Sequence, residues 1–264
     1  MKKKILSLCL VLALAAVAIV GGTLAYFTDT DSEDNTFTTA NVKIDLIEKQ
    51  RNEDGTALED FKDGKVLMPI VGSAQGDKDK FGMPIAKNYV DKIVTIQNLA
   101  VDAWVRLYYA VPQALDNKAD DSMDIIHMNL GNRYMADGTW TAENNTNADW
   151  TANMGAETFL TETTIDGIAY NVYYMDYNKI LTEGEETGSA FMVGLYMDKN
   201  VNYDNDTSEY TITRNGETSE INFDFSKGVT IPVYAVGVQA AGFTDADTAV
   251  NEAFGANFNP WAAE

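Results

Sequence analysis

The sequence predicts a mainly β protein, an antiparallel β-sandwich with one long loop excursion and one short C-terminal helix, preceded by a leader helix. Three observations favour this fold. Past the first 25 residues the apolar positions recur mostly every second residue, the strand-like runs are short and separated by turn residues, and a 264-residue chain that is 45% hydrophobic can bury a large core. No low-complexity linker divides the chain, so we expect a single domain over residues 26–264.

Residues 1–25 have the pattern of a secretory signal peptide. Three lysines precede a run over residues 5–20 that is apolar except for Ser7, and a short segment that ends at Ala25 provides the cleavage site. The apolar run is shorter than the roughly 20 residues that a spanning helix needs, so a retained membrane anchor is the weaker alternative. We predict cleavage between Ala25 and Tyr26, which makes the protein a secreted one.

The composition excludes several classes of partner. The formal net charge is −21, and removal of the leader with its three lysines brings it to about −24. So acidic a chain repels nucleic-acid phosphates and anionic lipid headgroups, which excludes nucleic acid and leaves membrane contact to the uncleaved leader. The single cysteine, Cys9, lies in the leader, so the mature chain would have no disulfide and no thiol catalysis.

Strand patterns follow one another after the leader. Residues 41–46 alternate polar and apolar side chains, as in a half-buried strand. Residues 89–97 and 103–111 are rich in Val, Ile, Trp and Tyr, and only five residues separate them, so we expect them to pair as antiparallel neighbours at the centre of one sheet. Further strand-like runs are residues 168–174, 188–197, 210–214, 220–225 and 229–239, with a typical hairpin turn at Asn215-Gly216.

Two stretches break the strand pattern. Residues 113–164 are polar and rich in Asn, Asp and Thr, which predicts a loop-rich insertion between core strands. Near the end of the chain, Asp245 is a typical N-cap residue and Gly255 a typical stop, so residues 245–254 are predicted to form a helix. We expect this helix to cover one edge or end of the sandwich.

Several segments resemble one family of exported proteins. The junction GGTLAYFTD (21–29), followed by NTFTTANV (35–42), is similar to the export signature of the TasA and camelysin family of Gram-positive secreted proteins, which use the dedicated SipW-type signal peptidase. Other segments are similar to motifs of that family and its clostridial relatives with alternate signal-mediated export: DKIVTIQN (91–98) with AWVR (103–106), ILTEGEET (180–187) before LYMD (195–198), and VGVQAAGF (236–243).

The resemblance implies a jelly-roll-like sandwich at the cell surface or in the biofilm matrix. It also implies self-association into filaments by donor-strand exchange, with other matrix or cell-wall components as further partners. The candidate donor is residues 26–37, in which Tyr26, Phe27 and Phe37 would anchor in the neighbouring subunit. The alternative is a flexible N-terminus before a normal first strand, because the acidic middle of the segment has low strand propensity.

An enzyme is the competing class, since camelysin relatives are catalogued as metallo-endopeptidases. A zinc protease normally presents two histidines one helical turn apart, with a glutamate between them. This chain has one histidine, His127, which could combine with Asp120, Asp121 and Asp124 only in an unusual one-histidine site. We therefore expect no catalytic residues, no metal and no cofactor.

A binding module is the third class. Asn202, Asp204, Asp206 and Ser208 alternate along the chain, and such oxygen ligands could surround calcium, although the glycine and glutamate of an EF-hand loop are missing. A polar hairpin loop is the simpler interpretation.

Three aromatic residues of the insertion form another binding candidate. Tyr134, Trp140 and Trp150 could stack on the sugars of a cell-wall glycan, or could pin the insertion to the core.

Overall fold

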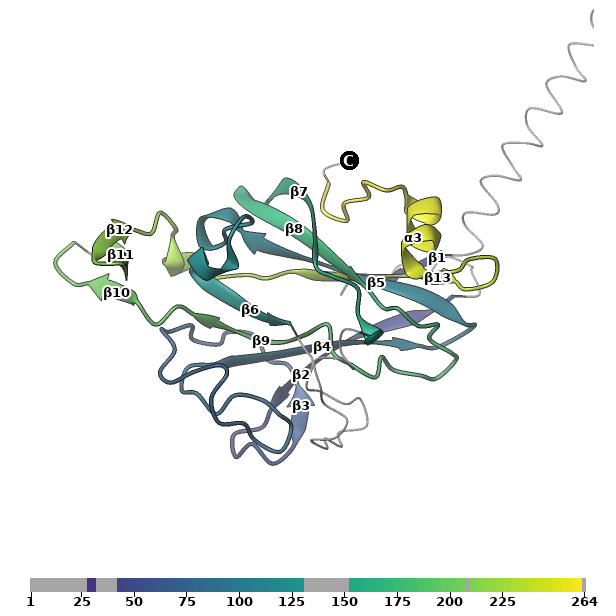
Figure 1. Ribbon diagram of the computed structural model, residues 1–264, viewed down its shortest axis with the longest axis horizontal. Coiled ribbons are helices and arrows are strands. Elements are labelled where there is room, and N and C mark those ends of the chain that lie inside the picture. The colour runs from purple at the N-terminus through teal and green to yellow at the C-terminus, as the bar shows by residue number, and fades with distance from the viewer. Residues whose placement is uncertain (1–27, 32–41, 131–151, 208, 263–264) are drawn as a thin grey trace, which may run out of the picture.

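The computed structural model describes residues 28–31, 42–130, 152–207 and 209–262 (Figure 1). It confirms the predicted antiparallel β-sandwich, because two five-stranded sheets pack face to face and a three-stranded sheet projects at one end. No helix in these ranges is long and apolar enough to cross a membrane. The leader and Ala25 lie outside the described residues.

The strands of each sheet come from distant parts of the chain. The first sheet contains β1 (Thr28–Asp31), β13 (Val233–Gln239), β5 (Ala103–Pro112), β8 (Ile168–Asp176) and β7 (Thr158–Ile165), in that spatial order. The second sheet contains β3 (Leu58–Asp60), β2 (Ile44–Arg51), β4 (Val90–Asn98), β9 (Met192–Met197) and β6 (Ile126–Leu130). The hairpin sheet contains β10 (Val201–Asp204), β11 (Glu209–Arg214) and β12 (Glu217–Glu220).

The central strand β5 is buried along its whole length, which explains why all its side chains except that of Arg106 are apolar or aromatic. Its side chains alternate between two clusters. Val105 and Leu107 belong to the main core between the two sheets. Trp104 and Tyr108 belong to a second cluster on the outer face of the first sheet, beneath the C-terminal helix.

The expected pairing of residues 89–97 with 103–111 is wrong. These residues form β4 and β5, which lie at the centres of different sheets, so the five residues between them cross from one layer of the sandwich to the other. The Asn98 side chain fixes this crossing by donating hydrogen bonds to the carbonyls of Val101 at 2.8 Å and Leu181 at 2.7 Å. Each strand is apolar because of the layer that covers it, so composition alone does not show which strand is its neighbour.

The expected insertion over residues 113–164 is also partly wrong. It contains two short 3-10 helices, η1 (Gln113–Leu115) and η2 (Asp121–Met123), and two sandwich strands, β6 and β7. Both strands are sheet edges and mostly half-buried. β7 is rich in Thr, whereas β6 alternates Ile126, Met128 and Leu130 with polar residues over only five positions. Tyr134, Trp140 and Trp150 lie outside the described residues.

The strand expected at residues 220–225 is displaced toward the N-terminus. The turn at Asn215-Gly216 is confirmed, with φ angles of 52° and 84°, and it joins β11 to the fully exposed strand β12. After β12 the chain leaves the sheet and forms the 3-10 helix η4 (Phe225–Lys227). The strand β13 begins at Val233, later than residue 229, directly after Pro232, which has no N–H to donate.

The predicted C-terminal helix is confirmed as α3 (Ala246–Phe254). The Asp245 carboxylate caps it by accepting a hydrogen bond of 2.7 Å from the Thr248 amide, and Gly255 ends it. The helix lies on the outer face of the first sheet against β5 and β13, and not at an edge or end of the sandwich (Figure 1). The reason is that β5 has apolar side chains on both faces, and its outer face needs a cover.

Candidate functional site

The edge of the first sheet is formed by the short strand β1. It pairs antiparallel with β13, from Thr28 opposite Val238 to Asp31 opposite Ala235. The pairing joins backbone groups, so the acidic side chains that lower strand propensity here do not prevent it. As an edge strand, β1 has a ladder on one side only, as β7 does at the opposite edge of the sheet.

β13 is longer than the strand that covers it. Its inner side pairs with β5 from Val233 opposite Tyr109 to Gln239 opposite Ala103. Its outer side, which we call the β13 edge, is paired by β1 only at residues 235–238. At Val233, Tyr234 and Gln239 the β13 edge has no ladder partner among the described residues, and such an edge is where a strand from another chain can add.

The β13 edge is packed closely against the second sheet at one point. A Cβ atom on Gly237 would lie 2.8 Å from Ile44 Cγ2 and 3.1 Å from Val42 Cγ1. Because β2 begins at Ile44, the start of the second sheet fixes the position of the β13 edge. The structure thus places part of the predicted donor segment, Thr28–Asp31, on this edge, whereas Tyr26, Phe27 and Phe37 lie outside the described residues.

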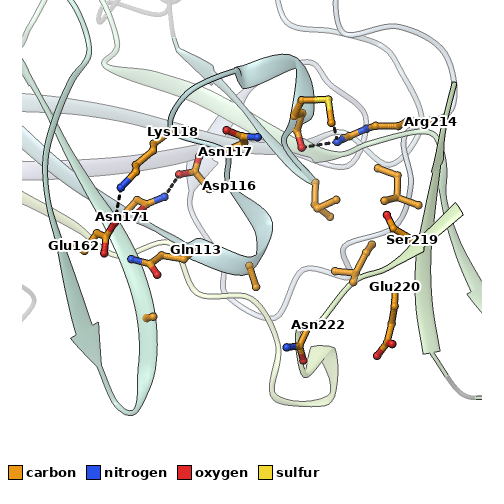
Figure 2. Close-up of a pocket in the computed structure, with 16 residues that line it drawn as sticks. Gln113, Asp116, Asn117, Lys118, Glu162, Asn171, Arg214, Ser219, Glu220 and Asn222 are labelled. Carbon is orange, nitrogen blue, oxygen red and sulfur yellow. Dashed lines mark hydrogen bonds and ion pairs between the residues drawn. The ribbon is translucent and has the colours of Figure 1, made fainter. Parts of the chain in front are cut away.

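A second candidate is a cleft of about 740 Å³ at the hairpin end of the sandwich (Figure 2). Its walls are the chain from η1 to Ile125, strands β7 and β8, and the inward face of β11 and β12. Figure 2 shows Asp116 and Asn171 on one side of the hollow and Ser219 on the other. Sequence analysis did not identify these residues, because they come from segments far apart in the chain and carry no motif.

Two side-chain hydrogen bonds hold Asp116 in the wall of the cleft. Its Oδ2 atom accepts hydrogen bonds from the Asn171 amide and the Tyr173 hydroxyl, each at 2.6 Å. Burial, together with this carboxylate, raises the pKa of Tyr173, so the phenol stays protonated and donates. The Oδ1 atom of Asp116 has no hydrogen-bond partner among the described residues, so this acceptor is available in the cleft wall.

Arg214 connects the hairpin sheet to the η2 segment. Its guanidinium donates to the carbonyl oxygens of Met123 and Asp124 and lies 3.4 Å from the Asp198 carboxylate. Partial burial disfavours the charge on Asp198, but the Asn200 amide, His127 and Arg214 outweigh it and hold the pKa of Asp198 below its ordinary value. This network makes Arg214 a structural cation of the cleft wall.

Asp124 is the one strongly perturbed carboxyl that we find beside the cleft in the described part of the chain. It is buried, and its Oδ1 atom accepts a hydrogen bond of 2.6 Å from the Asn117 amide. Burial raises the pKa of Asp124 to about 7, and the neighbouring carboxylates of Asp116 and Asp121 act in the same direction.

His127 lies on the edge strand β6 and faces neither an open site nor a second histidine. Its Nε2 atom is 3.1 Å from Asp198 Oδ2, and its ring stacks on Tyr196 with centroids 4.9 Å apart. Of the acidic residues considered with it, Asp120 caps η2 by accepting from the Ser122 amide. Among the described residues, no three His, Cys, Asp or Glu side chains are close enough to hold a metal ion.

The calcium candidates lie on an exposed hairpin, as the simpler interpretation predicted. Asn202 and Asp204 belong to β10, and Asp206 lies in the turn before β11. The Asp204 carboxylate accepts a hydrogen bond of 2.8 Å from the Asp206 amide, so it already stabilises the turn. Ser208 lies outside the described residues, and calcium binding stays a prediction.

Comparisons of the chain with protein-family models, with curated proteins and with solved structures find no match. The family resemblance seen in the sequence therefore stays a prediction, and a function has to be inferred from the geometry described above.

Proposed function

We propose that this protein is an exported structural protein of the cell surface or biofilm matrix, whose subunits join into fibres by exchanging their N-terminal strands. The observation that carries the proposal is the position of β1 at the edge of the first sheet, where it pairs with the β13 edge. The β1 strand of a second copy can form the same backbone hydrogen bonds with the same edge.

Exchange of β1 needs no new type of contact. Each subunit gives up the pairing of residues 28–31 with its own β13 and regains it with the β13 of a neighbour. Such a contact joins two different surfaces of the subunit, so it is heterologous, and a rotation that does not close produces a filament. Among the described residues, β1 pairs with the β13 edge only at residues 235–238, so the ends of that edge could accept a longer strand.

Export is supported by the leader pattern and by the composition. The predicted cut after Ala25 would free the segment that contains β1, and a SipW-type signal peptidase is the enzyme that the junction resembles. The acidic mature chain would stay soluble until it assembles. Other matrix or cell-wall components are the partners that we expect beyond the protein itself.

The proposal is tested with two purified chains, one beginning at Tyr26 and one beginning at Thr38, incubated side by side and examined by negative-stain electron microscopy. We expect filaments from the longer chain and none from the shorter one, which lacks β1. In the longer chain, Thr30→Pro should also prevent assembly because it removes a backbone N–H from β1, whereas Thr38→Pro is the matched control. Equal assembly by both chains would rule out strand exchange.

A further inference from the structure

Two hollows meet on the hairpin sheet. Glu220, Ile221 and Asn222 line both the cleft of Figure 2 and a neighbouring hollow of about 490 Å³. Tyr210 lines the smaller hollow and Ile212 the cleft. Because side chains two residues apart on a strand share a face, both hollows open on the same face of β11.

The smaller hollow is aromatic. The ring centroids of Tyr203 and Tyr210 are 4.9 Å apart, those of Tyr210 and Phe225 are 4.4 Å apart, and Phe223 follows at 5.0 Å from Phe225. Tyr210, Phe223 and Phe225 pack against the main core, which makes the group rigid. Tyr203 is 47% exposed, so one side of its ring is open to a ligand.

The cleft adds hydrogen-bonding groups to the ring faces of the smaller hollow. The Asp116 carboxylate offers its Oδ1 atom, and the side chains of Gln113 and Asn222 add amide donors and acceptors. The apolar side chains of Ile125 and Ile212 lie between these groups. This combination of planar hydrogen-bonding groups and ring faces matches a pyranose, which has hydroxyl groups around its rim and apolar C–H faces.

The charges select against an acidic ligand. Glu209, Glu220 and Asp224 line the aromatic hollow, and no basic residue does. In the cleft, Lys118 forms an ion pair with Glu162, and the Arg214 guanidinium is bound to backbone carbonyls. Neither cation is therefore available to an anion, and the chain as a whole carries −21.

We propose that the two hollows form one binding groove for an uncharged glycan chain of hexose or N-acetylhexosamine units. One sugar ring stacks on Tyr203, and a neighbouring unit donates a hydroxyl hydrogen bond to Asp116 Oδ1 across the segment from Glu220 to Asn222. This site differs from the aromatic residues singled out in the sequence, and it depends on neither strand exchange nor filament formation.

The test is an NMR titration of the ¹⁵N-labelled chain that begins at Tyr26 and carries Thr30→Pro, the variant that we expect not to assemble. The probes are three tetrasaccharides: N-acetylglucosamine and glucose oligomers, both uncharged, and an acidic galacturonate oligomer. We expect at least one uncharged probe to shift amide signals of residues 113–118 and 203–225, and the acidic probe to shift none. The proposal is overturned if neither uncharged probe shifts these signals at about 10 mM, or if the acidic probe binds more tightly.

Variants locate the site. Tyr203→Ala should weaken binding roughly five- to tenfold, since it removes the open ring face. Asp116→Asn keeps an acceptor for Asn171 and Tyr173 but places an amide N–H₂ in the cleft, and it should weaken binding roughly fivefold. The matched controls are Asn202→Ala, the exposed neighbour on the opposite face of β10, and Asp121→Asn, an exposed carboxylate that does not line the cleft. Equal losses in variants and controls would contradict the groove.

Discussion

Gly237 on β13 and Ile44 on β2 approach so closely that a single methyl group on the glycine would lie 2.8 Å from Ile44 Cγ2. The glycine thus sets the separation of the two sheets at the edge where β1 is paired. Its neighbours in the ladder are Asp29 of β1 and Val105 of β5, so the same residue belongs to the proposed exchange site and to the central sheet. The close approach therefore holds β13 against the second sheet, so the proposed exchange requires β1 to move and not β13.

Gly237→Ala should destabilise the fold. The added Cβ atom pushes against Ile44 and Val42, and overpacking of this kind costs about 1–3 kcal/mol. Urea unfolding followed by circular dichroism measures the loss. Gly188→Ala is the matched control, because the nearest atom to its Cβ would be the Tyr177 hydroxyl at 3.8 Å. A control that loses as much stability as Gly237→Ala would argue against the close approach.

Arg106→Ala should be among the most destabilising substitutions in the chain. The buried guanidinium binds both carboxylate oxygens of Asp176, at 2.6 and 2.9 Å, and also reaches Asp247 of α3 at 2.8 Å. Its removal leaves Asp176 without its cation and detaches the helix, at a cost of about 3–5 kcal/mol. The same unfolding assay should show less than about 1 kcal/mol for Lys49→Ala, whose partner Asp60 is exposed.

Asp124→Asn should stabilise the protein in a pH-dependent way. Burial raises the pKa of Asp124 to about 7, whereas the unfolded chain has an ordinary value near 4, so between these values only the folded state holds the proton. The stability contributed by this proton is complete below about pH 4 and is lost as the pH rises through 7. Asparagine does not titrate and keeps the acceptor for the Asn117 amide.

Melting curves of the Asp124→Asn variant and the parent chain at pH 4 and pH 8 check this expectation. The variant should gain about 3–4 kcal/mol over the parent at pH 8 and little at pH 4. Asp63→Asn, at an exposed loop position away from this carboxyl cluster, should give no such difference. A gain that is the same at both values would show that Asp124 does not titrate in this range.

The sequence predicts most elements of this fold but not their neighbours. Alternation locates β2, runs rich in apolar and aromatic residues locate β4, β5 and β8, and the cap at Asp245 locates α3. The patterns do not show that β4 and β5 belong to different sheets. A strand that is covered on both faces has the same apolar composition in either sheet. The edge strands β6 and β7 are missed because β6 is only five residues long within a polar stretch and β7 is rich in Thr.

The candidate sites also differ in whether the sequence predicts them. Residues 28–31 of the proposed donor segment lie at a sheet edge, and the sequence draws attention to them because they follow the predicted leader. The cleft is not found, since Asp116, Asn171 and Arg214 are brought together only by the packing of η1, β8 and the hairpin sheet. His127 is a candidate metal ligand in the sequence because it is the single histidine. In the structure its ring contacts Asp198 and Tyr196.

Engineered disulfides test strand exchange most directly. Thr30 lies opposite Val236, and directly opposite residues of an antiparallel pair have Cβ atoms about 4.5–5.5 Å apart, near the range of a disulfide. The only native cysteine, Cys9, is absent from a chain that begins at Tyr26, so no other thiol competes. Thr30→Cys and Val236→Cys chains are mixed, allowed to assemble and oxidised, and then separated on a non-reducing gel. Strand exchange predicts a disulfide-linked dimer of the two variants; filaments that form without any such dimer would contradict it.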